Sequence, residues 1–115
     1  MKDDLMKTLK DAGFDTEGTL ERFGGSEEMY EEFLGTFLKD KTFETIKPAF
    51  DKNDKEEALN TTHTLKGVSG NLGMTRLYKA CCNTVELIRA NEFEKARDSY
   101  GELEAAYEET CNLIK

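Results

Sequence analysis

Apolar residues in the last quarter of the chain recur at alternating steps of three and four, the spacing of one face of an α-helix. The series is Phe93, Ala96, Tyr100, Leu103 and Tyr107. Similar spacing recurs along most of the chain, whereas β-branched residues are sparse and never alternate as they do in a strand. The pattern therefore predicts an all-α fold, and 115 residues form a single domain of ordinary size, residues 1–115.

Turn and capping signals divide the chain into helical segments. Ser26 and Asp54 are predicted N-caps, and Asp54 with Glu57 reads as a capping box. Pro48 has no backbone N–H, so it predicts a break between about 41 and 48. Thr75 is predicted to cap the next helix, and Asn91 with Glu94 reads as a further capping box before the last one. The expected helices cover residues 2–11, 16–23, 27 to about 52 with that break, 55–71, 76–90 and 92–114. Four substantial helices with short connections favour an antiparallel up-down four-helix bundle, with one or two short extra N-terminal helices.

The run from His63 to Gly73 contains the only histidine in the chain. At about 100° per residue, Lys66, Gly67 and Gly70 fall on the same helix face as His63. The predicted core stripe lies on the opposite face and consists of Ala58, Leu65, Val68 and Leu72. We therefore expect the imidazole to face solvent, beside a positive charge and two positions without side chains. Imidazole titrates near neutral pH, which suits nucleophilic and proton-transfer chemistry.

This run resembles the signature of histidine-containing phosphotransfer (HPt) domains, which read His-x-Leu-Lys-Gly with a small residue and a glycine further on. The stretch from Phe14 to Leu34 is similar to the segment that opens many such domains, and Leu77 with the helix around it also fits. The resemblance covers nearly the whole chain. It implies an HPt-like helical domain that accepts a phosphoryl group on His63 from a receiver aspartyl phosphate and passes it to another receiver aspartate.

The neighbours of His63 have roles in this interpretation. Lys66 is expected to place an ammonium group beside the phosphoryl oxygens. A glycine inside a helix costs about 1 kcal/mol relative to alanine, so Gly67 and Gly70 are expected to admit a closely approaching partner. Leu59 is expected to belong to an apolar docking patch. The alternatives are a surface histidine, a solvated lysine, glycines that allow helix packing, and a partly covered edge leucine.

Two further positions concern the surroundings of the imidazole. Ser69 is expected to bond within the bundle rather than to phosphate. The resemblance also implies a polar side chain on the neighbouring helix that holds the second imidazole nitrogen. Asn83 and Glu86 are candidates, although Cys82 and Val85 occupy nearby positions. Water, or no orienting group at all, remains an alternative.

The formal net charge of −8 argues against nucleic acid as a partner, because a phosphate backbone would be repelled. The charge is unevenly distributed. Residues 1–51 carry a net charge of −6 and residues 92–115 carry −4, whereas residues 52–91, which include His63, carry +2. This distribution suits a site that receives an anion, although it could also arise by chance.

The sequence begins without an apolar run and has no long apolar segment, so we expect neither a signal peptide nor a membrane span. Cys81, Cys82 and Cys111 show no metal-ligand spacing, and an odd number of cysteines suggests reduced thiols in the cytoplasm. Cys81 is expected to be a small core residue. We expect no cofactor or metal ion on this chain; the resemblance implies that Mg²⁺ belongs to the receiver partner.

The most specific interpretation is a phosphorelay intermediate of two-component signalling. Its expected partners are response-regulator receiver domains or a hybrid sensor kinase, and the expected state is a monomer. The sequence contains no nucleotide-binding loop, so we expect a phosphoryl carrier rather than an autonomous enzyme. One alternative is the phospho-accepting domain of a chemotaxis-type kinase whose kinase domain lies elsewhere, although Met1 and the end on the last helix favour a free-standing protein. The other alternative is a helical adaptor that is never phosphorylated.

Overall fold

A computed structural model describes residues 2–115 of the chain, with side chains from residue 4 onward. The secondary structure in this range is helical and contains no strand. The elements are α1 (Lys2–Asp11), α2 (Thr16–Arg22), α3 (Glu27–Lys39), the short 3₁₀ turn η1 (Phe43–Thr45), α4 (Ile46–Asp51), α5 (Lys55–Asn71), α6 (Thr75–Arg89), α7 (Phe93–Asp98) and α8 (Tyr100–Ile114). The predicted all-α class is confirmed.

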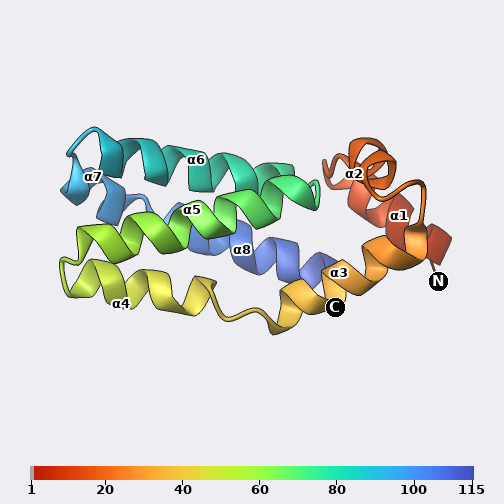
Figure 1. The fold of residues 1–115 in the computed structure, drawn as a ribbon, viewed down its shortest axis with the longest axis horizontal. Coiled ribbons are helices and arrows are strands. Elements are labelled where there is room, and N and C mark those ends of the chain that lie inside the picture. Colours follow the sequence, from red (N-terminus) through yellow and green to blue (C-terminus); the bar gives the residue numbers. More distant parts are fainter. Residues whose placement is uncertain (1) are drawn as a thin grey trace.

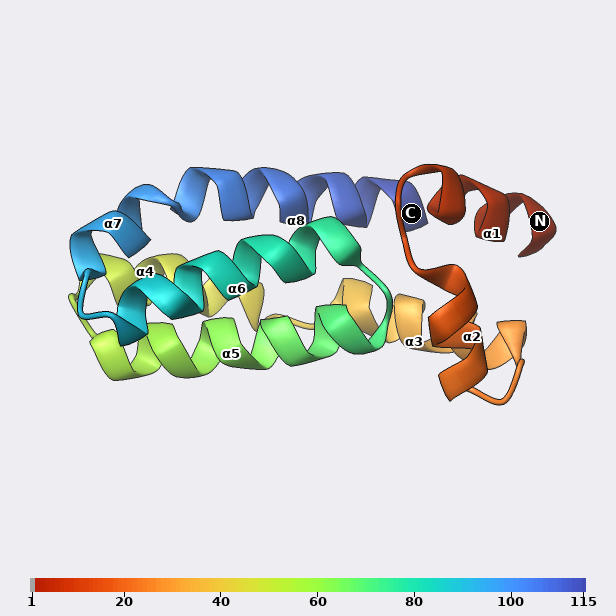
Figure 2. The same ribbon diagram turned by 90° about the horizontal axis from the view of Figure 1, so that it is seen from above.

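The long helices lie side by side along the long axis of a molecule that measures 43 × 22 × 20 Å. Helix α5 packs against α6 and α4, and α6 packs against α8 (Figures 1 and 2). The short helices α1 and α2 lie at one end, where α1 contacts α8, and α7 lies at the other end. None of the helices described is both long and apolar enough to cross a membrane.

The core consists of the inward faces that the helical spacing predicts. Leu65 of α5, Leu77 and Val85 of α6, and Leu103 of α8 are almost completely buried. Burying a side chain of this size contributes roughly 1.5–3 kcal/mol, so the stripes of neighbouring helices hold the molecule together. Aromatic rings extend the core, and the rings of Phe43 and Tyr107 stack with centroids 4.0 Å apart.

Two of the predicted N-caps are confirmed. The side chain of Ser26 accepts the Met29 N–H at 3.1 Å, and that of Asp54 accepts the Glu57 N–H at 3.0 Å. The reciprocal half of the Asp54 capping box is absent, because the Asp54 N–H donates to the carbonyl of Ala49 at 2.9 Å. Helix α5 nevertheless begins and ends as predicted, at residues 55 and 71.

The predicted break before α4 is present, but Asp40 rather than Pro48 accounts for it. Asp40 has extended backbone angles, φ −71° and ψ 132°, and follows the last residue of α3. Its carboxylate accepts the N–H and the hydroxyl of Thr42, at 2.8 and 2.6 Å. Pro48 lies in the first turn of α4, where its missing N–H has no intrahelical partner to lose.

The predicted caps of the last two helical segments are wrong. Thr75 is the first residue of α6 rather than its cap; the cap position is Met74, which is buried in the core and makes no side-chain capping bond. Asn91 adopts a left-handed conformation with φ 61°, and α7 begins after Glu92 without a side-chain cap. The carboxylate of Glu92 instead pairs with Lys95 at 3.0 Å. In both places buried packing and turn geometry override the local capping signal.

The predicted last helix, residues 92–114, is interrupted at Ser99, which separates α7 from α8. The Ser99 hydroxyl donates to the carbonyl of Ala96 at 2.7 Å and lies 2.9 Å from the hydroxyl of Thr84 on α6. A serine that bonds to the preceding turn competes with the helical hydrogen bonds and bends the helix. The apolar spacing continues across this residue, so it could not reveal the interruption.

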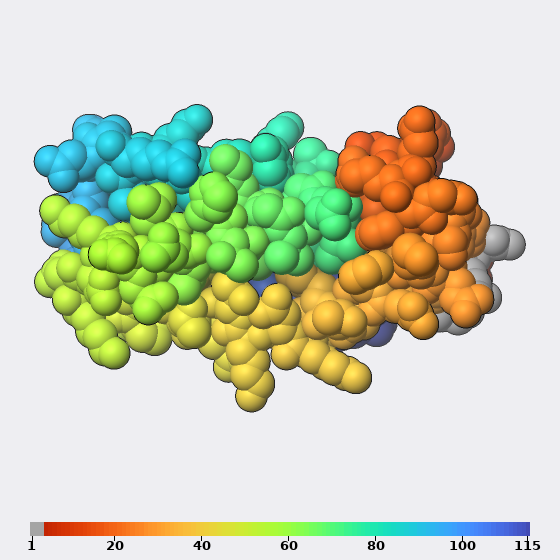
Figure 3. Space-filling model, viewed as in Figure 1, coloured from red at the N-terminus to blue at the C-terminus, as the bar shows by residue number. Residues whose placement is uncertain are grey.

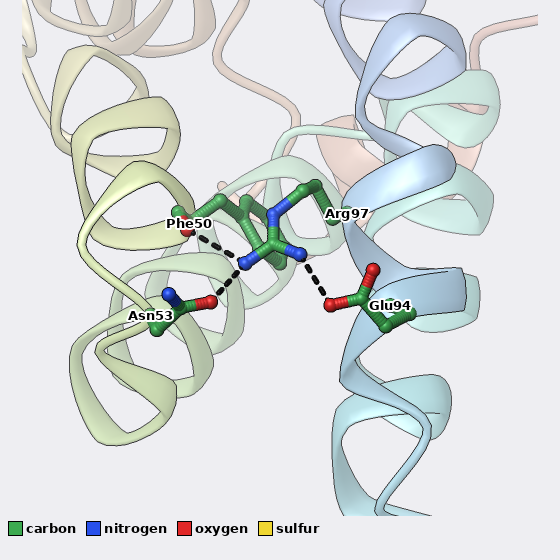
Figure 4. Close-up of polar contacts among 4 residues, drawn as sticks. All are labelled: Phe50, Asn53, Glu94 and Arg97. Carbon is green, nitrogen blue, oxygen red and sulfur yellow. Dashed lines mark hydrogen bonds and ion pairs between the residues drawn. The ribbon is translucent and has the colours of Figure 1, made fainter.

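Arg97 of α7 holds the connection between α4 and α5 (Figure 4), at the end of the molecule away from α2 (Figure 1). Its guanidinium donates to the carbonyl of Phe50 at 3.0 Å and to the side-chain oxygen of Asn53. It also pairs with Glu94 at 2.7 Å and lies over the ring of Phe93, 5.2 Å from its centroid. The position from which α5 starts is therefore held by contacts with α7.

Candidate functional site

His63 lies in the middle of α5 and is exposed, as the helix spacing predicts. Figure 3 shows α5 along the front face of the molecule. The opposite face of α5 is buried through Ala58 and Leu65, followed by Leu72 just after the helix, whereas Val68 is half-buried against the core. Among the residues described, His63 has no hydrogen-bond or ion-pair partner, so its imidazole nitrogens are accessible to a reaction partner.

The imidazole borders an open cleft of 570 Å³ between α5, the start of α6 and α2. Helix α5 contributes Lys66 and Gly67 to this cleft, α6 contributes Tyr78, and α2 contributes Arg22. Lys66 is half-buried and forms no ion pair with any residue described. The cleft therefore combines a nucleophilic side chain with the nearby ammonium of Lys66, which suits an anionic group, and has a guanidinium at its α2 end.

The two predicted docking glycines differ in their surroundings. A Cβ atom built on Gly67 has no other atom within 4 Å, so this position faces open space. A Cβ atom on Gly70 would come within 2.9 Å of the Tyr78 ring. At Gly70, the structure therefore supports the packing alternative, because the absent side chain is what lets Tyr78 lie against α5. Its role in partner docking stays a prediction.

The expectation for Ser69 is confirmed, whereas the docking role expected for Leu59 is not tested. The Ser69 hydroxyl is buried and donates to the carbonyl of Lys66 at 3.0 Å, which confirms a bond within the bundle. Leu59 is half-buried and packs against the core, as the edge-residue alternative describes. It does not line the cleft beside His63, and its membership of a docking patch stays a prediction.

Neither candidate for orienting the imidazole lines the cleft. Asn83 borders a separate groove beside α8, which it shares with Arg76 and Glu102. Glu86 is exposed and makes no contact with His63 in the part of the chain described. On α6, Tyr78 lines the cleft instead, and hydrogen bonding with the Cys82 thiol raises the pKa of Tyr78.

The cysteines are unpaired thiols. Cys81 is completely buried, which confirms it as a core residue, and desolvation raises its pKa to about 12. No cluster of three or more histidine, cysteine or acidic side chains suited to a metal ion occurs in the described part of the chain.

Residues near the N-terminus bind the carbonyls at the end of α5, which have no partner within the helix. Arg22 donates to the carbonyls of Gly70 and Asn71, at 3.2 and 3.0 Å. The buried hydroxyl of Tyr30 donates to the carbonyl of Leu72 at 2.7 Å, and desolvation raises the pKa of this tyrosine. Helix α5, which carries His63, is thus anchored at the end nearest the cleft.

Gly73 determines how the N-terminal helices meet the turn between α5 and α6. Its φ of +73° is in the left-handed region that favours glycine. A Cβ atom here would come within 2.4 Å of the Thr19 hydroxyl and 2.6 Å of the Asp15 carbonyl. The Asp15 N–H donates to the Gly73 carbonyl at 2.9 Å. The absent side chain therefore allows α2 to approach the cleft.

With this geometry in place, a comparison with protein families matches residues 28–112 to the Hpt domain. The chain belongs to the HPt domain family. Comparisons with curated proteins and with solved structures gave no match. HPt domains serve histidine phosphotransfer in two-component phosphorelays and interact with receiver domains or kinases. The match begins after α2, so α5 and His63 lie inside it and Arg22 lies outside it.

Several cleft residues were not predicted from the sequence, among them Asp15, Arg22 and Tyr78. Arg22 is the only arginine before residue 76, which is a weak signal. Nothing in the sequence indicates that its side chain reaches the end of α5, 48 and 49 residues away along the chain. Tyr78 falls one turn after the start of α6, but its proximity to Gly70 depends on how α5 and α6 pack.

Proposed function

We propose that this HPt domain is a phosphoryl carrier that accepts its phosphoryl group on His63. The donor is the aspartyl phosphate of a receiver domain, and the acceptor is the aspartate of another receiver. The observation that carries the proposal is the single histidine, which is exposed on α5 beside the cleft. Lys66 and the open position at Gly67 lie one turn further along the same helix face, on either side of the histidine. All three residues lie within the matched range.

The chemistry needs little more than positioning and charge stabilisation. The neutral, outward-facing imidazole nitrogen attacks phosphorus, an N–P bond forms, and the bond between phosphorus and the aspartyl oxygen breaks. The aspartate leaves as a carboxylate, and the other ring nitrogen keeps its proton. The attacking nitrogen carries no proton, so this step requires no base from the protein. The reverse sequence returns the phosphoryl group to a second carboxylate.

Lys66 supports this transfer through its charge. It lies one helical turn after His63 and has no competing ion pair among the described residues, so its ammonium is available to the phosphoryl oxygens. Charge-assisted hydrogen bonds of this kind are about twice as strong as neutral ones. Gly67 leaves the space through which the receiver approaches.

The same proposal extends to the metal ion, the location, the oligomeric state and the arrangement of the helices. We expect Mg²⁺ to be bound by the receiver, and this chain to act as a cytoplasmic monomer without kinase or hydrolase activity of its own. The helices that lie along the long axis, with α3 and α4 counted together and α7 and α8 counted together, fit an antiparallel up-down four-helix bundle. Helices α1 and α2 then correspond to the two short additional N-terminal helices.

The proposal is tested by incubating the protein with receivers charged by acetyl phosphate, and separately with phosphoramidate as a small donor. Label on wild type should be acid-labile and base-stable, as a phosphoramidate bond requires. His63→Gln should retain its helical circular dichroism and lose labelling by both donors, because exposed His63 fills no core space. A helical His63→Gln variant that still accepts label would refute the assignment.

A further inference from the structure

Arg22 occupies the α2 end of the cleft that holds His63. Its Nη2 donates to the Thr19 hydroxyl at 3.1 Å and to the carbonyls of Gly70 and Asn71 at 3.2 and 3.0 Å. Its Nε also donates to the Asn71 carbonyl, at 3.3 Å. An exposed arginine on a mobile side chain would occupy many positions, whereas these contacts hold one edge of this guanidinium in place.

The other edge of the guanidinium is available. Nη1 of Arg22 has no hydrogen-bond acceptor, and Arg22 forms no ion pair, among the residues whose side chains are described. The carboxylate of Asp15 also borders the cleft, but its Oδ1 accepts the Gly18 N–H at 3.0 Å and it is not paired with Arg22. Arg22 thus presents a fixed, unpaired cation with two unused N–H donors.

A planar guanidinium fixed in this way is suited to binding a carboxylate. Because the orientation is already set, little conformational entropy is lost when a partner binds. The proposed partner must bring an aspartyl phosphate to His63, and the Mg²⁺ expected on that receiver would itself be held by carboxylates, so acidic side chains would lie on the surface that enters the cleft. Arg22 is the last residue of α2 and precedes residue 28, where the match to the family begins. Any role of Arg22 in binding a receiver therefore comes from the N-terminal helices of this chain.

The geometry points to Arg22 as a specificity-determining residue, whose free Nη1 edge binds a carboxylate on the incoming receiver at the α2 end of the cleft, seven to eight residues along α5 from the phosphorylated aspartate at His63. This inference rests on the proposed function. It adds that the N-terminal helices, through Arg22, select among receivers by the presence of an acidic side chain at that position. Lys66 serves the phosphoryl group itself, whereas Arg22 serves the protein that delivers it.

The test uses the full chain and three variants: Arg22→Gln, Arg22→Lys and, as a control, Arg89→Gln. Arg89 is an exposed arginine in the last turn of α6, at the end away from α2, and its replacement changes the net charge equally. For each protein, two rates are measured, labelling by a phosphorylated receiver and labelling by phosphoramidate. The receiver rate is measured at low and high salt, and circular dichroism reports the fold.

We expect Arg22→Gln to slow labelling by the receiver about tenfold at low salt, and to flatten its salt dependence, because a charge at an interface acts mainly on association. Labelling by phosphoramidate should remain unchanged, Arg22→Lys should recover part of the receiver rate, and Arg89→Gln should resemble wild type. A receiver rate that Arg22→Gln leaves unchanged overturns the inference while the proposed function stands. Equal losses with both donors and reduced helicity also overturn it, since Arg22 would then act only by holding the end of α5. Wild type that takes no label from either donor contradicts the proposed function instead.

Discussion

The Tyr78 ring on α6 covers Gly70 on α5 so closely that a methyl group added at Gly70 would come within 2.9 Å of the ring. One turn earlier on the same helix face, Gly67 has no such neighbour. Two glycines with the same sequence signal therefore differ in their surroundings, since one lies under a side chain of this protein and the other faces open space, where we propose that a partner docks.

Replacing the two glycines should separate these roles. Gly67→Gln should raise stability by a few tenths of a kcal/mol through helix propensity, yet slow transfer from a receiver at least tenfold, because a long side chain enters the docking space. Labelling by phosphoramidate should continue. Gly70→Ala should instead displace Tyr78 and lower the melting temperature. The measurements are both labelling rates and thermal unfolding; a Gly67→Gln variant with normal receiver transfer would place the docking surface elsewhere.

Lys66→Ala should slow transfer without abolishing it. A partly exposed ammonium beside a phosphoryl group is worth about 1–2 kcal/mol, so a loss of roughly tenfold in rate is expected. The lifetime of phosphohistidine should change as well, because the same charge stabilises the product. Lys79→Ala, at an exposed lysine on α6, is the control. If Lys66→Ala changed neither quantity, Lys66 would be an ordinary solvated lysine.

Replacing Thr62 with valine should make the folded protein more stable. Its hydroxyl is completely buried and has no hydrogen-bond partner among the residues described. Valine has nearly the same shape and lacks the unsatisfied oxygen, so Thr62→Val should raise the free energy of unfolding by about 1 kcal/mol. Urea unfolding measures this change, and labelling of His63 should be unaffected. A destabilised variant would indicate that the hydroxyl finds a partner in solution.

Stability should fall in alkaline solution. Burial raises the pKa of Cys81 from 9.0 to about 12 and also raises that of Tyr30 from 10.0. Both groups lose protons more easily when the chain is unfolded, so their contribution is complete below pH 9 and is lost as the pH rises towards 12. Urea unfolding between pH 8 and 11 should show this decline, with a shallower slope for Cys81→Ala. A flat profile would contradict the assigned burial.

Helix α5 was the most predictable part of the structure. Asp54 marks its start, and its length and the inward face through Leu65 follow from local sequence. The interruption at Ser99 and the missing cap at Thr75 were not predictable, because contacts with Thr84 and the burial of Met74 determine them. These contacts join residues whose proximity follows from packing between helices, not from spacing within one.

The same distinction applies to the candidate site. The shared face of His63, Lys66 and Gly67 follows from helical geometry alone, so the sequence sufficed to predict it. The opposite wall of the cleft depends on α2, which reaches α5 through Arg22 and the left-handed turn at Gly73. No local pattern encodes a hydrogen bond between residues 49 positions apart.

Two arginines fix the two ends of α5. Arg97 binds the loop from which the helix starts, and Arg22 binds the carbonyls at its end, on either side of a rod about 25 Å long. A shift or tilt of α5 would break the hydrogen bonds of Arg97 at its start or those of Arg22 at its end. The reorientation required for in-line attack therefore falls to the imidazole and to the loops of the visiting protein. We therefore expect the protein to transfer a phosphoryl group without a conformational change of its own. Its backbone should be the same whether or not His63 is phosphorylated.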